Sequence, residues 1–211
     1  MELVYVISGL AVGFIVGMTG VGGGSLMTPV LLFFGINPAT AVGTDLLYAA
    51  ITKAGGVLVH NRQRNIDWNL TGWLALGSLP AACITLWVLH AWNPDVHTLN
   101  AIIKRGLGFA LMLTALAIIF KQQLLNFAHR AAPGWINMPR SIQVSATVAT
   151  GIMLGVLVTL TSIGAGALGT VALFMLYPLM KTTRLVGTEI AHAVPLTLIA
   201  GLGHAGLGNM D

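Results

Sequence analysis

Long apolar segments constrain this chain more than any other feature, because few folds can accommodate them. Eight such segments alternate with short polar stretches, and they cover roughly residues 3–19, 24–35, 41–59, 69–91, 98–120, 143–160, 163–178 and 185–204. Several reach the roughly 20 residues that a helix needs to cross a bilayer. Only 8% of the 211 residues are charged, whereas soluble domains carry about 25%. The sequence therefore predicts an all-α integral membrane protein whose main partner is the lipid bilayer.

The polar residues exclude several function classes. The net charge of +4 comes from Lys and Arg residues scattered near segment ends, where membrane topology uses them, so nucleic acid is not expected as a partner. The chain has one cysteine, Cys83, and no disulfide framework is expected. No H-E-x-x-H, Ser–His or Cys–His arrangement supports an enzyme, and the sequence predicts no cofactor and no metal site.

An internal repeat relates the two ends of the chain. At a shift of 142 residues, a series of small and apolar residues coincides: Gly13, Val16, Thr19, Gly22, Gly24, Leu26, Thr28 and Leu31 fall on Gly155, Val158, Thr161, Gly164, Gly166, Leu168, Thr170 and Leu173. At a shift of 144, "VGTD" at 42–45 falls on "VGTE" at 186–189, and His60 falls on His204. Chance rarely gives glycines, threonines, an acid and a histidine in one order.

The repeat predicts the domain organisation. We expect duplicated helical-bundle halves: a first transmembrane repeat over 1–120, a cytoplasmic linker over 121–141 and a second transmembrane repeat over 142–211. The second half stops where its last helices are expected, so roughly two spanning helices are predicted to be missing from it. The alternative is an asymmetric protein that has lost them.

Glycine-rich breaks precede the two shortest apolar segments, 24–35 and 163–178. These segments are therefore predicted to be half-helices, and duplicated halves with broken helices are typical of secondary transporters. The two breaks read "GVGGG" at 20–24 and "GAG" at 164–166. Backbone N–H groups left unpaired at each break, together with the N-terminus of the following helix, would favour the binding of an anion. Thr28 could add a hydroxyl donor. The alternative, small-residue packing between helices in G-x-x-x-G spacing, stays open.

Among the ionisable residues inside apolar segments, where a charge costs several kcal/mol and usually marks function, Asp45, Lys53, Glu189 and His192 are the candidate functional residues. Asp45 and Glu189 occupy equivalent repeat positions. They are either acids at a helix start near the membrane interface or a proton- or cation-coupling pair beside a substrate cavity. Lys53 could attract an anion, pair with another helix or extend to the interface. His192 is a candidate proton relay.

Charge asymmetry predicts the topology only in part. Arg62 and Arg64 place loop 60–68 in the cytoplasm, the basic residues of linker 121–141 place it there too, and loop 92–97 has no Lys or Arg and is expected outside. Basic residues differ between the equivalent turns 36–41 and 179–184, which favours inverted halves. Parallel halves remain open if the short segments do not fully cross.

Two long motifs suggest a family. "GMTGVGGGSLMTPVLLFFGINPATAVGTDLLYAAITK" at 17–53 resembles the first signature of the TauE/SafE sulfite exporter family, also called the toluene-sulfonate uptake permease family. "SIGAGALGTVALFMLYP" with "RLVGTEIAHAVPLTLIAGLGH", within 162–204, resembles its second signature. The resemblance covers essentially the whole chain. It implies a multi-pass protein of the bacterial inner membrane that transports small sulfur-containing anions, such as sulfite or sulfoacetate, coupled to the proton gradient.

The resemblance also implies a substrate site. Its motif residues are Gly20, Gly22, Gly23, Gly24, Thr28, Gly43 and Thr44 in the first half, with Asp45, and Gly164, Gly166, Thr170, Gly187 and Thr188 in the second, with Glu189. The second break reads "GAG" where many members have three glycines. The two acids stand where many members have serine, and this departure favours a proton-coupled variant.

Together these features predict an inner-membrane secondary transporter of small anions. Asp45, Glu189 and His192 would handle protons, with Lys53 beside them. The alternative function is a membrane-embedded partner of a sulfur-relay or assembly system without transport of its own. The sequence does not decide the transport direction, and a homo-oligomer is compatible with either function.

Overall fold

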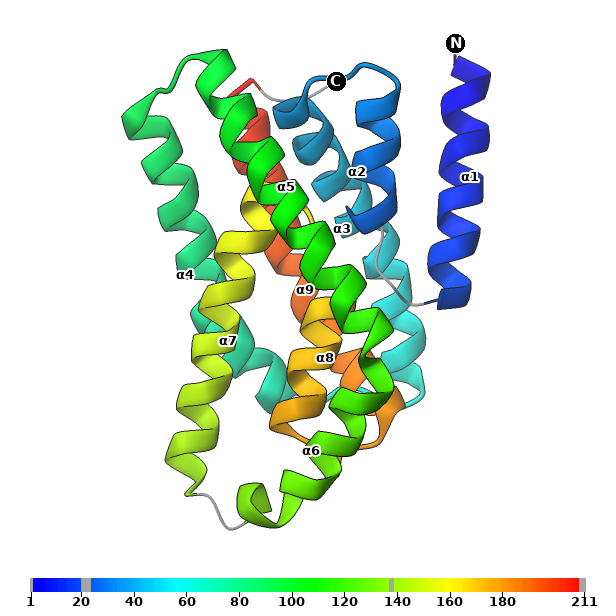
Figure 1. Cartoon of the computed structure of the whole chain (residues 1–211), viewed down its shortest axis with the longest axis vertical. Coiled ribbons are helices and arrows are strands. Elements are labelled where there is room, and N and C mark those ends of the chain that lie inside the picture. Colours follow the sequence, from blue (N-terminus) through cyan, green and yellow to red (C-terminus); the bar gives the residue numbers. More distant parts are fainter. Residues whose placement is uncertain (1, 20–23, 137–138, 209–211) are drawn as a thin grey trace.

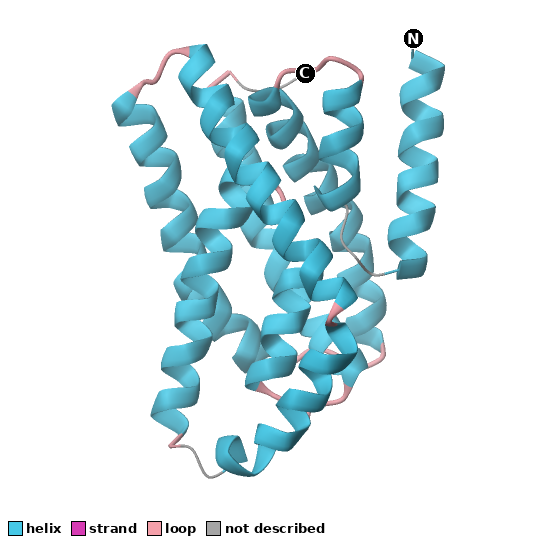
Figure 2. Ribbon diagram, viewed as in Figure 1, coloured by secondary structure: helices cyan, strands magenta, loops and turns pink. Residues whose placement is uncertain are grey.

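The structure, a computed structural model, describes residues 2–19, 24–136 and 139–208. Secondary structure in these ranges is entirely helical (Figure 2). The helices are α1 (Glu2–Thr19), α2 (Gly24–Phe33), α3 (Pro38–Arg62), α4 (Trp68–Trp92), α5 (Val96–Ile119), α6 (Lys121–Ile136), α7 (Arg140–Thr161), α8 (Ala167–Leu176) and α9 (Thr182–Gly206). Five of the helices are long and apolar enough to span a membrane: α3, α4, α5, α7 and α9. The prediction of an all-α integral membrane protein is confirmed.

Local signals set the helix boundaries. Pro38 occupies the start of α3, and the Asn37 side chain caps it by accepting a hydrogen bond from the Thr40 N–H at 3.0 Å. Asp67 caps α4 in the same way through the Leu70 N–H at 3.2 Å. α2 and α8 are each 10 residues long, about half of a membrane crossing. The two half-helices are therefore present where the glycine breaks predict them.

The helices of the two repeats run in opposite directions. α3 and α9 are both 25 residues long, and their bounds differ by the repeat shift of 144. The added Cβ of Gly201 would contact Leu47, that of Gly56 would contact Ile190, and that of Gly187 would contact Asn65. Residues later in α3 thus contact residues earlier in α9, so the two helices pack antiparallel. Figure 1 shows both helices running between the two ends of the bundle. The inverted arrangement holds for this pair, and the parallel alternative does not.

Glycines also bring α4 of the first half against α7 of the second. A Cβ at Gly151 would lie 2.3 Å from the Leu74 carbonyl oxygen, and one at Gly155 would lie 2.4 Å from that of Ser78. This is the G-x-x-x-G packing that lets two backbones approach in a membrane. Helix α9 is the most enclosed of the candidate spans. In its apolar 18-residue stretch 61% of the residues are buried, whereas the corresponding share is 28–39% in the other four. α1 lies at the edge of the bundle, on the side of α2 (Figure 1).

The segment between the halves is more ordered than a polar linker. Residues 121–136 form α6, and its Leu124 and Leu125 line a small gap with Val171 and Phe174 of α8. Although this segment is polar overall, it is amphipathic, and its leucines face α8. The division at 121–141 stays a prediction, but the segment is helical over most of its length.

Basic residues gather at one end of the bundle. Figure 1 places the α3–α4 connection, the beginning of α7 and the α8–α9 connection at one end, which we call the basic end. These connections carry or adjoin Arg62, Arg64, Arg140, Lys181 and Arg184. The loops 34–37 and 93–95 lie at the opposite end (Figure 1) and contain no Lys or Arg. The charge rule therefore predicts that the basic end faces the cytoplasm.

Cysteine labelling tests this arrangement. Cys83 is exposed on α4, so it is first replaced by alanine. In that background, a membrane-impermeant maleimide should label I36C only from outside the cell and L179C only in inside-out vesicles, because the two turns lie at opposite ends. Labelling of both cysteines from the same side would contradict the antiparallel repeats.

Candidate functional site

The start of α2 meets the second glycine break inside the bundle. Gly24 begins α2, and a Cβ there would lie 2.0 Å from the carbonyl oxygen of Ser162, the C-cap residue that follows α7. Gly164 follows at φ +125°, a conformation that favours glycine. The chain then turns into α8. The predicted site residues Gly20, Gly22 and Gly23 of the first break lie outside the described residues.

The second break satisfies several of its own backbone donors. The Ser162 N–H donates to the Val158 carbonyl at 2.7 Å, and the Gly166 N–H donates to the Gly164 carbonyl at 2.8 Å. The Ile163 N–H donates to the Thr161 hydroxyl at 3.1 Å. Fewer N–H groups are therefore free for an anion here than the sequence suggests, since the chain turns back on itself instead of opening.

Asp45 lies beside the point where α2 meets the second break. It is fully buried on α3, and the Thr28 hydroxyl donates to its Oδ2 at 2.7 Å. The Ser162 hydroxyl lies close to the same carboxyl group. Neither Asp45 Oδ1 nor Ser162 Oγ has a hydrogen-bond partner among the described residues. Thr28 thus joins α2 to Asp45 on α3, and two buried polar atoms there are left for a water molecule or a ligand.

Glu189 occupies the equivalent position in the second half. Its side chain is 2% exposed, and a Cβ on Gly169 of α8 would lie 3.0 Å from its Oε1. That oxygen has no hydrogen-bond partner in the described part of the chain. Gly169, which no sequence motif marks, leaves room for this carboxyl group.

The interpretation of both acids as residues at a helix start is wrong. Asp45 lies seven residues beyond Pro38, and Glu189 lies seven residues beyond Thr182, about 10 Å into each helix. Helix α3 begins one turn or more before the Val-Gly-Thr motif, because Asn37 and Pro38 provide an earlier start signal. Both acids are therefore buried within spans.

The two acids lie at different depths. Ile190 of α9 packs near Gly56 of α3. Because the two helices are antiparallel, Glu189, the residue before Ile190, lies level with the residue that follows Gly56. That is a dozen residues beyond Asp45, or about 20 Å along the helix. Asp45 is nearer the end opposite to the basic end, and Glu189 is nearer the basic end. They form the two ends of a column and not a side-by-side pair.

Lys53 lies between them. Its ammonium donates a hydrogen bond to the Ala165 carbonyl of the second break. It is close enough to act electrostatically on Asp45, Glu189 and His192, yet no ion pair joins it to any described residue. We call the set Thr28, Asp45, Lys53, Ser162, Ala165 and Glu189 the polar column. Lys53 supplies its central positive charge.

His192 adds a further polar contact. It is fully buried on α9, and its Nε2 lies 2.7 Å from the Ser78 hydroxyl of α4. Its Nδ1 has no partner among the described residues. Ser78 was not predicted, since one serine in an apolar helix gives little signal. His204, in contrast, bonds the Thr159 carbonyl at 2.8 Å, which suits a packing role.

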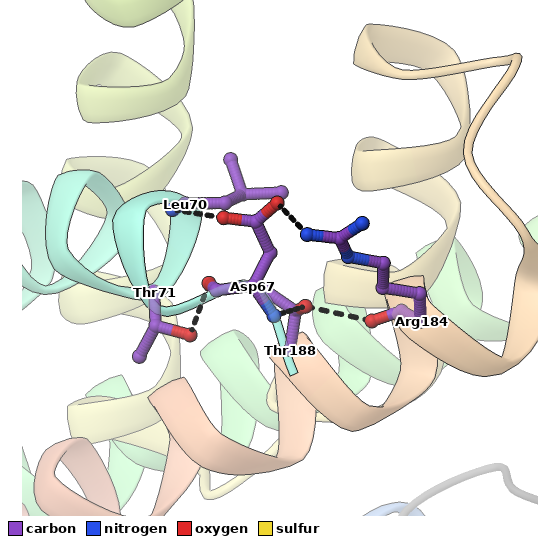
Figure 3. A network of polar contacts seen from close by, with 5 residues as sticks. All are labelled: Asp67, Leu70, Thr71, Arg184 and Thr188. Atoms are coloured by element: carbon purple, nitrogen blue, oxygen red, sulfur yellow. Dashed lines mark hydrogen bonds and ion pairs between the residues drawn. The ribbon is translucent and has the colours of Figure 1, made fainter. Parts of the chain in front are cut away.

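Gly187 and Thr188 contact a different feature. A Cβ on Gly187 would lie 2.2 Å from the Asn65 carbonyl oxygen. The Thr188 hydroxyl accepts from the Asp67 N–H at 2.9 Å and donates to the Arg184 carbonyl at 2.6 Å (Figure 3). Arg184 also pairs with the Asp67 carboxylate at 2.8 Å. These contacts fasten α9 to the start of α4, so we leave both residues out of the column.

The remaining predicted residues lie near the column on their helices. Gly43 is buried and Thr44 half-buried on α3, directly before Asp45. Thr170 is half-buried on α8, next to Gly169, and its N–H donates to the Gly166 carbonyl at 2.9 Å. No group of three or more His, Cys, Asp or Glu side chains in the described ranges could hold a metal ion.

Comparison with known proteins identifies the family. The family model described as sulfite exporter TauE/SafE matches residues 5–211. The chain is 42% identical over 212 residues to the probable membrane transporter protein YjnA of Bacillus subtilis, covering 100% of this chain and 82% of that protein. It is 28% identical to the probable membrane transporter protein YdhB of Bacillus subtilis, over 94% of this chain and 77% of that protein.

A similar protein also occurs in an archaeon. The probable membrane transporter protein MJ0441 of Methanocaldococcus jannaschii is 27% identical, over 92% of this chain and 69% of that protein. No solved structure matches the chain significantly. Both predicted signatures fall inside the range that the family model matches. This multi-pass membrane protein therefore belongs to the TauE/SafE sulfite exporter family.

Proposed function

We propose that this protein is a secondary transporter of small anions, with sulfite and organosulfonates such as sulfoacetate as substrates, in the bacterial inner membrane. The observation that carries the proposal is the polar column. It combines the half-helix α2 and the second glycine break with a cation that no ion pair neutralises among the described residues and two buried acids at membrane depth. Such groups are costly in a bilayer, and they mark substrate and ion pathways in transporters.

Lys53 is the proposed contact for the anion. An ammonium group has three N–H donors, and one of them is directed at the Ala165 carbonyl. The other two are available to sulfonate or sulfite oxygens. Ser162 Oγ and His192 Nδ1, which have no partner among the described residues, are further polar contacts within the same region.

The two acids are proposed to couple anion movement to protons. An ionised carboxylate about 5 Å from a passing anion would repel it by roughly 3 kcal/mol at an effective dielectric constant of 20. A protonated carboxyl group is neutral and can donate a hydrogen bond to the anion instead. The anion would therefore pass Asp45 or Glu189 only with a proton bound there, which links the two fluxes.

A flux assay tests this function. Full-length protein in proteoliposomes is given labelled sulfite or sulfoacetate, with and without an imposed pH gradient, and with lactate as a carboxylate control. Accumulation of the sulfur anions should require the pH gradient and should disappear with a protonophore. Absence of flux for every anion under all gradients would refute the transporter proposal and would favour a role as a partner protein.

A further inference from the structure

A polar cleft opens at the basic end, away from the column. Its volume is about 200 Å³, enough for several water molecules or one small organic anion. It lies where α4 and α7 begin and α8 ends. The polar and aromatic side chains that line it are Asp67, Asn69, Trp73, Arg140, Gln143 and Tyr177.

The charge balance of the cleft favours an anion. Asp67 is its acidic residue, and Arg184 neutralises that carboxylate at 2.8 Å, as Figure 3 shows. Arg140 is exposed, and no hydrogen bond or ion pair holds its guanidinium group among the described residues. A guanidinium offers a planar set of N–H donors that matches the oxygens of carboxylates, sulfonates and similar oxyanions. Arg140 is therefore the unneutralised charge of the cleft.

An apolar layer separates the cleft from the polar column. Buried Leu70, Leu74, Leu173, Phe174 and Leu185 pack together, and Tyr177 and Met180, which line the cleft, pack against them. We call these five buried residues the plug.

The plug lies one helical turn from the polar residues deeper in the bundle. On α4, Leu74 lies four residues before Ser78, the partner of His192. On α9, Leu185 lies four residues before Glu189, and on α8, Leu173 lies four residues after Gly169, its neighbour. Four residues span about 6 Å along a helix. The cleft and the Glu189 end of the polar column thus lie on opposite sides of the plug.

We infer that the cleft is a binding site for small sulfonate or sulfite anions at the cytoplasmic face, with Arg140 as its anchor and the plug as the closed inner gate. This inference rests on the proposed function, since it assigns the cleft to the anion that the column carries. The Asp67–Arg184 pair borders the site and keeps the acid from repelling the ligand.

A cysteine in the cleft measures anion binding without transport. N69C is introduced together with C83A, and the protein is purified in a neutral detergent, which leaves no lipid phosphate in excess. The anionic reagent 2-sulfonatoethyl methanethiosulfonate should modify N69C faster than its trimethylammonium counterpart. Adding R140Q should lower this preference about tenfold, an ordinary size for electrostatic rate effects. Sulfoacetate should slow the modification of N69C only while Arg140 is present.

Two controls make the result specific to the cleft. R130Q removes the same charge from exposed Arg130 of α6, near the same end, and should leave the N69C rates unchanged. Q123C on α6 should be insensitive both to R140Q and to sulfoacetate. If N69C shows no anion preference, no dependence on Arg140 or no protection by sulfoacetate, the cleft is not an anion site. If sulfoacetate protects N69C but the protein shows no flux in proteoliposomes, the transporter proposal is refuted, while the assignment of the cleft as an anion site still holds.

Discussion

Replacing Asp45 or Glu189 by its amide abolishes pH-gradient-driven accumulation of the anion, while exchange of labelled for unlabelled anion continues. D45N keeps an oxygen that accepts the Thr28 hydrogen bond, and E189Q keeps the shape that fits beside Gly169. Each variant loses the proton-binding group but presents no negative charge to the anion. Accumulation should fall at least about tenfold, which corresponds to about 1.4 kcal/mol of lost coupling, and exchange should change much less.

Asp95 offers a matched control for these amides. It caps α5 outside the spans, where the Thr98 hydroxyl and N–H hold the pKa of its carboxyl group below its usual range. A lowered pKa keeps this group charged at neutral pH and delays its protonation to more acidic pH. Asparagine is an equally good cap, so D95N should leave both accumulation and exchange unchanged. Equal losses in D45N and D95N would contradict a coupling role for Asp45.

Replacing Gly24 by alanine separates α2 from the second break and stops transport. The added Cβ would lie 2.0 Å from the Ser162 carbonyl oxygen, and a backbone atom cannot rotate away. Overpacking of this kind costs about 1–3 kcal/mol, more than the roughly 1 kcal/mol that alanine gains over glycine within a helix. Both accumulation and exchange should be lost, and the unfolding temperature in detergent should fall.

G55A is the control for this substitution. Gly55 lies on α3, and nothing lies within 4 Å of the Cβ that alanine would add. The same change there should leave flux intact and the unfolding temperature equal or higher, because only the helix preference acts. If G24A transports as well as G55A does, the contact between α2 and the second break is not needed for function.

The internal repeat and the glycine clusters that interrupt the apolar segments made much of the fold predictable. The glycine clusters and the repeat predict α2 and α8 as half-helices, and the structure has both at 10 residues. The repeat also predicts α3 and α9 as equivalent helices. Their antiparallel packing does not follow from loop charges alone, since the direction of α9 depends on whether the short helices return to the membrane face they came from. Glycine contacts such as Gly201 on Leu47 decide it.

The site was predictable only where a residue is unusual for its surroundings. Asp45, Lys53, Glu189 and His192 stand out because ionisable groups are rare in apolar segments, and the structure places them on α3 and α9, which pack against each other. Ser78 gives no such signal, because its importance depends on the packing of α4 against α9. Thr188 is the opposite case: its motif matches that of Thr44, but the motif does not show that loop 63–67 packs against the second copy.

The most direct test of the account is whether an anion gradient moves protons. Sulfoacetate is suited to this measurement because it stays fully ionised near neutral pH, so any proton that moves with it is carried by the protein. Proteoliposomes with an internal pH dye receive an outward sulfoacetate gradient and no pH gradient. Protons should leave with the anion, so that the lumen becomes alkaline in the wild type and not in the D45N or E189Q variants. Sulfoacetate efflux with no change of internal pH would contradict it.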